Sequence, residues 1–192
     1  LADENGFLII FDEVQSGAGR TGKMWAHQWS GMTPDIMAVA KGVGGGFPMG
    51  AFMATKEAAK GMVVGVHGTT FGGNPLAMAV GNAAYDELSK PAFLEHVNKV
   101  ANYLSQSLEG LKDRHPNLVV DTRGKGLLRG IKLTVNPKDI QAKLRARKVL
   151  VGVAGDNVLR IAPPLTIKEE ELSQLIDAID AVLAAQMAEA SA

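Results

Sequence analysis

The chain has 192 residues, 46% of them hydrophobic and 21% charged, which is typical of a globular protein with a packed core. Its 20 basic and 20 acidic residues cancel, so no excess charge predicts binding to nucleic acid or to an anionic membrane surface. The absence of cysteine excludes disulfides and thiolate metal sites and fits a reducing compartment, and no apolar run approaches the roughly 20 residues that span a bilayer.

The first residues have the pattern of a helix end followed at once by a strand. Residues 1–6 close on a glycine, and residues 7–11 form a continuous apolar run. Such a run is typical of a parallel strand buried on both faces. Because the chain starts inside a helix–strand unit and not at a methionine, we interpret it as part of a longer protein.

Two further strands are predicted before the first long helix, at 35–40 and 50–55. A loop rich in small residues follows at 67–75. Pro75 suits the first turn of an alanine-rich helix that runs to about Leu88. Weaker helical segments are expected at 23–31 and 56–62.

From Lys90 onward the pattern changes to helices that alternate with short strands. Apolar spacing predicts, in order, a helix over 97–111, strands at 118–122 and 127–133, a helix that opens at Asn136-Pro137, strands at 149–153 and 157–162, and a final helix that opens with a capping box of Thr166 and Glu169 and has its apolar face over 172–183. The fold class is therefore α/β, with an α/β unit over 1–90 and a smaller α+β unit over 91–192.

Two charged residues stand at the ends of the first two predicted strands. Asp12 follows the first apolar run, and Lys41 follows the second with no spacer. Ligands of open α/β sheets bind outside the carboxyl ends of the strands. The pair is either a salt bridge between strand ends or a cofactor site, in which Lys41 forms a Schiff base while Asp12 faces a cationic ring nitrogen.

Glycines at 44–46 follow Lys41 and fit a backbone that passes close to another group, although a generic tight turn explains them as well. Neither GxxxxGK[ST] nor GxGxxG occurs, so a nucleotide loop has little support. Thr69 and Thr70 lie among further glycines and offer hydroxyls and amides to a phosphate, or form an ordinary loop.

Arg160 lies inside an apolar strand and needs an anion, which is either a substrate carboxylate or an acidic side chain of the protein. The four histidines show no metal-ligand spacing, so no metal site is expected.

Four motifs in this order make the sequence resemble the class III pyridoxal-phosphate aminotransferases: DEVQSGAGRTG, PDIMAVAKGVGGGFPMGA, HGTTFGGNPLA and LRIAPPLTI. The resemblance covers nearly the whole chain and corresponds to the C-terminal half of a family member. It implies the fold of a fold-type I pyridoxal-phosphate transferase. Residues 1–90 would be the C-terminal part of the large cofactor-binding domain, with its parallel-sheet core, and 91–192 the small C-terminal domain.

The resemblance also implies roles around pyridoxal 5'-phosphate. Lys41 would form the Schiff base and later move the proton of the 1,3-shift. Asp12 would pair with the protonated pyridine nitrogen and keep the ring an electron sink. Val14 would pack on the ring face, and Gln15 would reach the phenolic oxygen.

The remaining roles concern the phosphate and the substrate. Thr70, with Thr69, would bind the cofactor phosphate from the neighbouring subunit of a homodimer. Arg160 would hold the α-carboxylate of glutamate or 2-oxoglutarate. The resemblance implies a cytoplasmic enzyme of arginine biosynthesis with small-molecule substrates and no nucleic-acid or membrane partner.

Within the family, AKGVGGGFPMGA and HGTTFGGNPLA favour the acetylornithine branch, with amino transfer between N-acetylornithine and 2-oxoglutarate. Succinylornithine, ornithine or 4-aminobutyrate as donor, or an aminomutase reaction, are alternatives on the same fold. A non-catalytic anion-binding module and a dimerisation scaffold are alternatives of other classes. Ser16 and Gly42 stand where threonine and alanine are common, outside the proposed roles. Because the upstream half is missing, we expect the isolated chain to be inactive.

Overall fold

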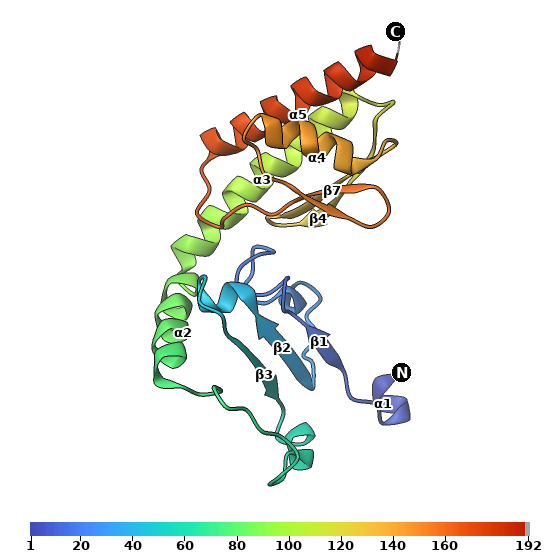
Figure 1. The fold of residues 1–192 in the computed structure, drawn as a ribbon. Coiled ribbons are helices and arrows are strands. Elements are labelled where there is room, and N and C mark those ends of the chain that lie inside the picture. Colours follow the sequence, from blue (N-terminus) through green and yellow to red (C-terminus); the bar gives the residue numbers. More distant parts are fainter. Residues whose placement is uncertain (191–192) are drawn as a thin grey trace. The chain divides into compact units, whose positions relative to one another are not determined.

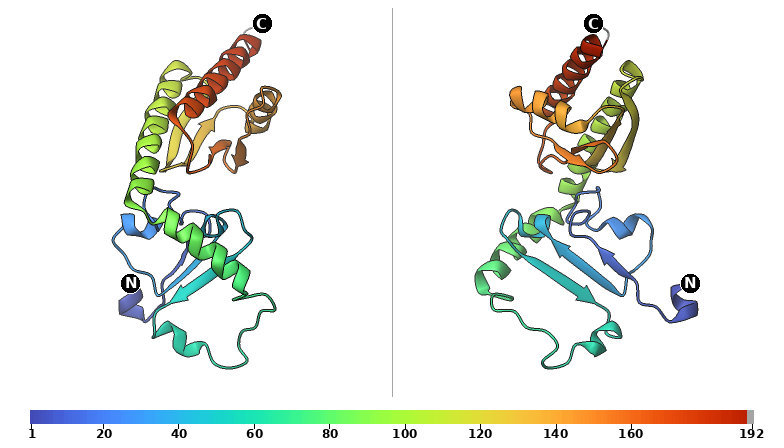
Figure 2. Two further views of the ribbon diagram at one scale, coloured as in Figure 1. Left: turned by 90° about the vertical axis from the view of Figure 1, so that its left-hand side faces the viewer. Right: turned by 45° about the vertical axis from the view of Figure 1, so that its right-hand side comes forward.

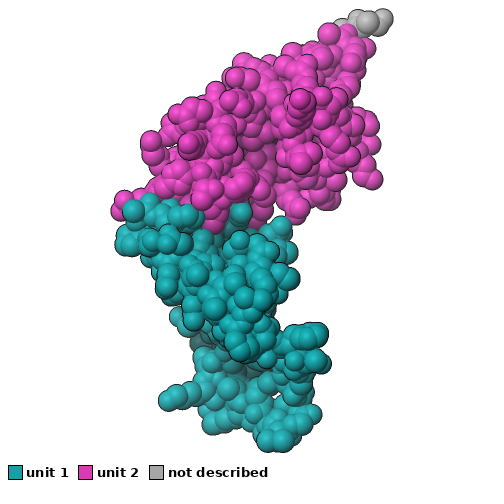
Figure 3. Space-filling model, turned by 60° about the vertical axis from the view of Figure 1, so that its left-hand side comes forward, with its two compact units in different colours: residues 1–94 teal, residues 95–192 magenta. Residues whose placement is uncertain are grey.

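The computed structural model describes residues 1–190 and divides the chain into two compact units. The first unit extends from Leu1 to Leu94, and the second begins at Glu95 (Figure 3). Within the described residues, no helix is both long enough and apolar enough to cross a membrane.

The first unit is a small α/β arrangement with several single-turn 3-10 helices (Figure 1). Its elements are, in chain order, α1 (Ala2–Asn5), β1 (Ile10–Asp12), η1 (Ala26–Trp29), β2 (Ile36–Ala40), η2 (Lys41–Gly44), β3 (Gly50–Ala54), η3 (Ala58–Gly61) and α2 (Pro75–Leu88).

The sheet of the first unit has the order β1-β2-β3. β1 and β2 are parallel, with Ile10 opposite Ile36 and Asp12 opposite Ala38. β3 is antiparallel to β2 and forms one edge, so the sheet is mixed. Figure 2 shows the three strands side by side. Because β1 and β2 run the same way, their carboxyl ends meet at one edge of the sheet.

The expectation that residues 7–11 form a strand buried on both faces is wrong. Strand pairing begins only at Ile10, and the side chains of Phe7 and Leu8 are 67% and 53% exposed. Pairing starts late because Asp35 holds the chain just before it: the N–H of Ile9 donates to Asp35 Oδ2 at 2.8 Å. β1 is also an edge strand, so nothing in the described sheet covers its outer side.

The second unit packs three helices on a four-stranded antiparallel sheet of order β4-β5-β7-β6. Its elements are α3 (Pro91–Arg114, which starts shortly before the boundary), β4 (Val119–Lys125), β5 (Leu128–Leu133), α4 (Pro137–Ala146), β6 (Gly152–Ala154), β7 (Val158–Ile161) and α5 (Glu169–Ala190). A capping box of Thr166 and Glu169 requires a helix that begins at Ile167, but α5 begins two residues later, at Glu169, so that prediction is wrong.

The two helices predicted from proline signals begin in the same way. Asn74 precedes Pro75, and its Oδ1 accepts a hydrogen bond from the N–H of Ala77 at 2.9 Å. Asn136 precedes Pro137 and caps α4, because its Oδ1 accepts a hydrogen bond from the N–H of Lys138 at 3.1 Å. Asparagine satisfies a free N–H of the first turn, and proline at the first position has none to lose.

Most of the hydrophobic core lies in the second unit. Its largest fully buried side chains come from all three helices and from the sheet: Leu104, Leu108, Leu111, Leu127, Ile131, Leu133, Ile140, Leu144, Leu159, Leu172, Ile179 and Leu183. Polar contacts join the C-terminal end of α3 to the middle of α5, because Arg114 Nε donates to Asp180 at 3.1 Å and His115 bonds the same carboxylate. This core holds β7, and with it Arg160, in a fixed sheet.

Candidate active site

The first group of predicted site residues lies at the carboxyl edge of the β1–β2 pair. Asp12 is the last residue of β1, and Lys41 directly follows Ala40 at the end of β2. The parallel pairing brings these two strand ends to the same edge of the sheet. Both side chains are exposed. The edge therefore presents an amine and a carboxylate to solvent, where a ligand could reach both.

Lys41 has an unusual backbone. Its φ is +52°, in the left-handed region that non-glycine residues rarely adopt, and it starts the 3-10 helix η2. Such a conformation costs of order 1–3 kcal/mol and persists only where the surrounding structure enforces it. Within residues 1–190, the Lys41 amine makes no hydrogen bond and no ion pair, so the salt bridge to Asp12 is not formed. The chain turns sharply at this residue and leaves its amine available.

Asp12 is oriented by its own loop. The N–H of Val14 donates to Asp12 Oδ1 at 2.9 Å, which fixes the carboxylate while leaving lone pairs for a further donor. Val14 is half-buried and Gln15 is exposed. The segment 12–15 thus offers a fixed carboxylate, an apolar side chain and an amide within four residues.

Glu13 is a part of the site that the sequence analysis missed. Its side chain is only 3% exposed. It accepts hydrogen bonds from the N–H of His27 at 2.7 Å, the N–H of Ala26 at 2.8 Å, and the Ser16 hydroxyl and His27 Nδ1 at 3.1 Å. Burial opposes ionisation, but these donors outweigh it and hold the pKa of Glu13 below its usual value.

Glu13 therefore anchors the chain that follows Asp12. It ties the end of β1 to η1, and the loop between them carries the motif SGAGRTG. Adjacent residues of a strand point to opposite faces, so the pair Asp12-Glu13 must place one carboxylate inside and one outside. That alternation is the signal that could have identified Glu13 from the sequence.

The glycines after Lys41 allow close approach of the chain to itself. A Cβ atom on Gly42 would lie 3.1 Å from Ala18 Cβ, so the loops after β1 and β2 touch. Cβ atoms on Gly44 and Gly45 would lie 2.8 Å from Met49 Cγ and 3.3 Å from Ala84 Cβ. A hollow of about 750 Å³ lies beside this turn and is lined by Ala40, Lys41, Gly42, Gly46, Phe47, Pro48 and Met49. The glycines thus shape the turn next to the amine.

Thr69 and Thr70 lie in an exposed loop that precedes α2. Thr69 Oγ1 accepts a hydrogen bond from the N–H of Gly72 at 3.1 Å, so it is used within the turn. Among the described residues, the Thr70 hydroxyl has no partner. Of the two threonines, Thr70 is the one whose hydroxyl is available to a ligand.

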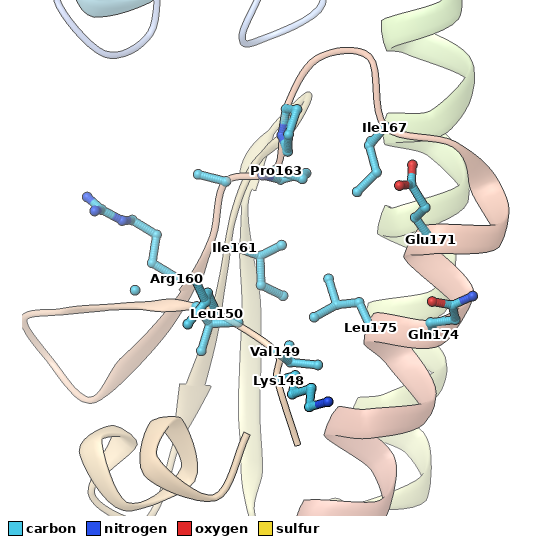
Figure 4. Close-up of a pocket in the computed structure, with 14 residues that line it drawn as sticks. Lys148, Val149, Leu150, Arg160, Ile161, Pro163, Ile167, Glu171, Gln174 and Leu175 are labelled. Atoms are coloured by element: carbon cyan, nitrogen blue, oxygen red, sulfur yellow. The ribbon is translucent and has the colours of Figure 1, made fainter. Parts of the chain in front are cut away.

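Arg160 lies in the second unit, on β7. A cavity of about 490 Å³ between β6, β7 and α5 is lined by Arg160 together with Ile161, Leu175 and other residues. Figure 4 shows that Arg160 points away from Ile161 and Leu175, toward the other side of the strand. Within residues 1–190 its guanidinium makes no ion pair, so the alternative of an internal salt bridge is not formed.

Comparison with known proteins gives consistent matches. The family described as aminotransferase class-III matches residues 1–183. The acetylornithine aminotransferase of Mesorhizobium japonicum is 53% identical over 181 residues, covering 94% of this chain and 45% of that protein.

Solved structures match as well. N-acetylornithine aminotransferase from Stenotrophomonas maltophilia K279a has a TM-score of 0.86 at 31% identity, covering 98% of this chain and 50% of that chain. Ornithine aminotransferase from Toxoplasma gondii ME49 has a TM-score of 0.90 at 29% identity, covering 98% of this chain and 46% of that chain. The chain spans about half the length of the proteins that it matches.

Proposed function

The chain belongs to the class-III aminotransferase family, and from this membership we propose that it is part of a pyridoxal-phosphate-dependent enzyme that moves an amino group between N-acetylornithine and 2-oxoglutarate. The observation that carries the proposal is the unpartnered Lys41 amine at the same sheet edge as the Asp12 carboxylate. The donor is proposed from the acetylornithine aminotransferase relative, which is 53% identical to this chain over 181 residues.

The residues of the first unit fit the cofactor. Lys41 would hold it through its amine, and Asp12 would face the ring nitrogen, with its carboxylate already oriented by the N–H of Val14. Val14 would contact the ring, and Gln15 would donate to its phenolic oxygen. When bound, pyridoxal phosphate supplies an electron sink for bond cleavage at the carbon that bears the amino group.

The protein's own residues then have distinct tasks. Lys41 would move the proton of the 1,3-shift, with its amine acting as general base and then as general acid. Asp12 keeps the ring nitrogen protonated. Thr70, with Thr69, binds the phosphate, and Arg160 binds the α-carboxylate of the 2-oxo acid through its planar guanidinium.

We place the threonines in a homodimer, where each subunit completes the phosphate site of the other, and the enzyme in the cytoplasm. The support is family membership and the exposure of the threonine loop, whose residues 61–73 are all exposed in the single chain. A loop with this exposure is available to contact a second subunit, and it contributes little to the packing of its own unit.

The first test is covalent labelling of the intact protein. We expect pyridoxal phosphate followed by borohydride to place a reduced pyridoxyl group on Lys41, detected in a digest by mass spectrometry. Lys56, which is also exposed, is the control for nonspecific labelling. Lys41→Ala is expected to lower kcat by about a thousandfold or more, the scale of a lost acid–base group. An unlabelled Lys41, or an active Lys41→Ala variant, contradicts the proposal and favours the anion-binding module.

A second candidate donor is ornithine, which the TM-score of 0.90 to an ornithine aminotransferase favours. The two donors are separated by comparing kcat/KM for N-acetylornithine and ornithine with the same acceptor. A higher value for N-acetylornithine is expected, and a higher value for ornithine reassigns the donor while leaving the reaction class unchanged.

A further inference from the structure

Arg160 lies between two glycines in its sheet. β7 is an interior strand, so Arg160 has one cross-strand neighbour on each side. The neighbour on β6 is Gly152, and the neighbour on β5 is Gly130. Cross-strand neighbours usually place side chains beside each other on the same face of a sheet. At these two positions the guanidinium is left without a flanking side chain.

The side chain of Arg160 lies directly beside Gly152. A Cβ atom on Gly152 would lie 3.1 Å from Arg160 Nε, 3.4 Å from Nη2 and 3.5 Å from Arg160 Cβ, and no other residue is as close. The φ of Gly152 is not in the left-handed region, so its backbone does not require glycine. A side chain at position 152 would therefore press first on the side chain of Arg160.

The other two glycines nearby behave differently. A Cβ atom on Gly130 would lie 2.6 Å from Val158 Cγ1, a buried side chain, so Gly130 protects core packing. A Cβ atom on Gly155, in the turn between β6 and β7, would meet nothing within 4 Å. Gly152 alone among the three would push directly on the guanidinium.

We propose that Gly152 is a positioning residue that keeps the Arg160 guanidinium in the orientation that binds the carboxylate of the 2-oxo acid. This inference rests on the proposed function, since it assigns the carboxylate to Arg160. A methyl group at position 152 meets a flexible side chain and not the backbone, so the cost in stability is small, while the Arg160 guanidinium has to shift by a few tenths of an ångström. Bidentate binding of a carboxylate depends on the direction of the guanidinium donors.

The test uses the intact, cofactor-loaded enzyme, with N-acetylornithine and 2-oxoglutarate varied separately. Gly152→Ala is expected to raise the KM for 2-oxoglutarate about tenfold, the cost of one weakened charge-assisted hydrogen bond, with kcat within about twofold of the parent enzyme. The KM for N-acetylornithine should not change. Gly155→Ala, which adds the same methyl group to the same hairpin, should leave both KM values and the Tm unchanged.

A double variant shows whether Gly152 acts through Arg160. Arg160→Ala alone should raise the KM for 2-oxoglutarate, and adding Gly152→Ala should then have no further effect, because the interacting partner is gone. A normal KM in Gly152→Ala, or an additive effect in the double variant, overturns the role of Gly152 alone. A normal KM in Arg160→Ala overturns both that role and the assignment of Arg160 to the carboxylate.

Discussion

Adjacent carboxylates at the end of β1 have opposite environments. Asp12 is exposed and held by one N–H, whereas Glu13 is buried and accepts hydrogen bonds from Ser16, Ala26 and His27. The exposed carboxylate is suited to a ligand, and the buried one anchors the loop. This division makes Glu13 the residue whose loss should disturb the site without touching the ligand.

Replacing Glu13 by glutamine should lower the free energy of unfolding of the intact protein by about 2–3 kcal/mol at pH 7, because buried donors lose a charged acceptor. The pKa of Glu13 is lowered in the folded state from a reference of 4.5, so its stabilisation is complete above that value and is lost as the pH falls through the folded pKa. Urea unfolding at several pH values measures this. Glu13→Gln should remove part of the acid dependence.

Glu57→Gln is the matched control, since Glu57 is exposed and forms a surface ion pair with Lys60. It should change the free energy of unfolding by less than about 0.5 kcal/mol. Equal losses of unfolding free energy in the two variants would show that burial of the Glu13 carboxylate is not the cause of the loss.

At the scale of single residues, the sequence identified the groups that stand out chemically. Asp12, Lys41 and Arg160 are charges beside apolar runs, and such charges are visible without a structure. Glu13 could be found only from the alternation of the two carboxylates at the strand end, and Gly152 has no signal in the sequence. Their importance comes from partners distant along the chain or across a strand, and these contacts exist only after the chain has folded.

Among the elements, α2 and the turn after Lys41 form one packed pair. Met49 lies between Gly44 of the turn and Gly81 of the helix, where a Cβ atom on Gly81 would come within 2.8 Å of Met49 Cε. A glycine inside a helix costs about 0.5–1 kcal/mol relative to alanine. The packing of Met49 gives that cost a structural reason.

Gly81→Leu should therefore lower the free energy of unfolding by about 1–3 kcal/mol, although leucine is the better helix former. Its bulk must move Met49 and the turn that carries Lys41. Ala83→Leu, at an exposed position of the same helix, should be neutral or stabilising. Chemical unfolding of both variants measures the difference, and a stabilised Gly81→Leu variant would show that Met49 repacks freely.

The reliability of the predictions differed between elements. The starts of α2 and α4 were predicted at Pro75 and Pro137, because the signal is local: an asparagine cap followed by proline. The first strand was predicted three residues early. The N–H of Ile9 is taken by Asp35 from a distant segment, and no local pattern encodes that contact.

Across the whole molecule, burial is unevenly distributed. The largest fully buried side chains all belong to the second unit, whereas the sheet of the first unit exposes all of β3. Because apolar burial is the main force that stabilises a fold, the two units should differ in their ability to fold alone.

A polypeptide of residues 91–192, cut just before α3, should fold by itself and unfold cooperatively, with a free energy of about 5–10 kcal/mol. A polypeptide of residues 1–90 should show no cooperative transition. Thermal unfolding monitored by circular dichroism tests both polypeptides, and the dispersion of their NMR chemical shifts is a second readout. A cooperative transition of 1–90 would mean that its open sheet is stable without cover.

The family membership and the fold class were predicted from four motifs and are confirmed by the match to residues 1–183 and by the solved structures. Motifs carry this information because each requires particular residues at one place in the fold. The exposure of the first unit could not be predicted from these motifs. An apolar run is interpreted as buried when the elements that would cover it are assumed to be present.

The exposed loop before α2 gives the chain a characteristic response to proteases. No lysine or arginine lies between Lys60 and Lys90, so trypsin has no cleavage site there. Chymotrypsin can cut after Phe71 and elastase after Val64, both on exposed backbone that proteases prefer. One cut would separate Lys41 from α2, the helix that supports its turn. Resistance to these two enzymes therefore reports whether another surface covers the loop that carries Thr70.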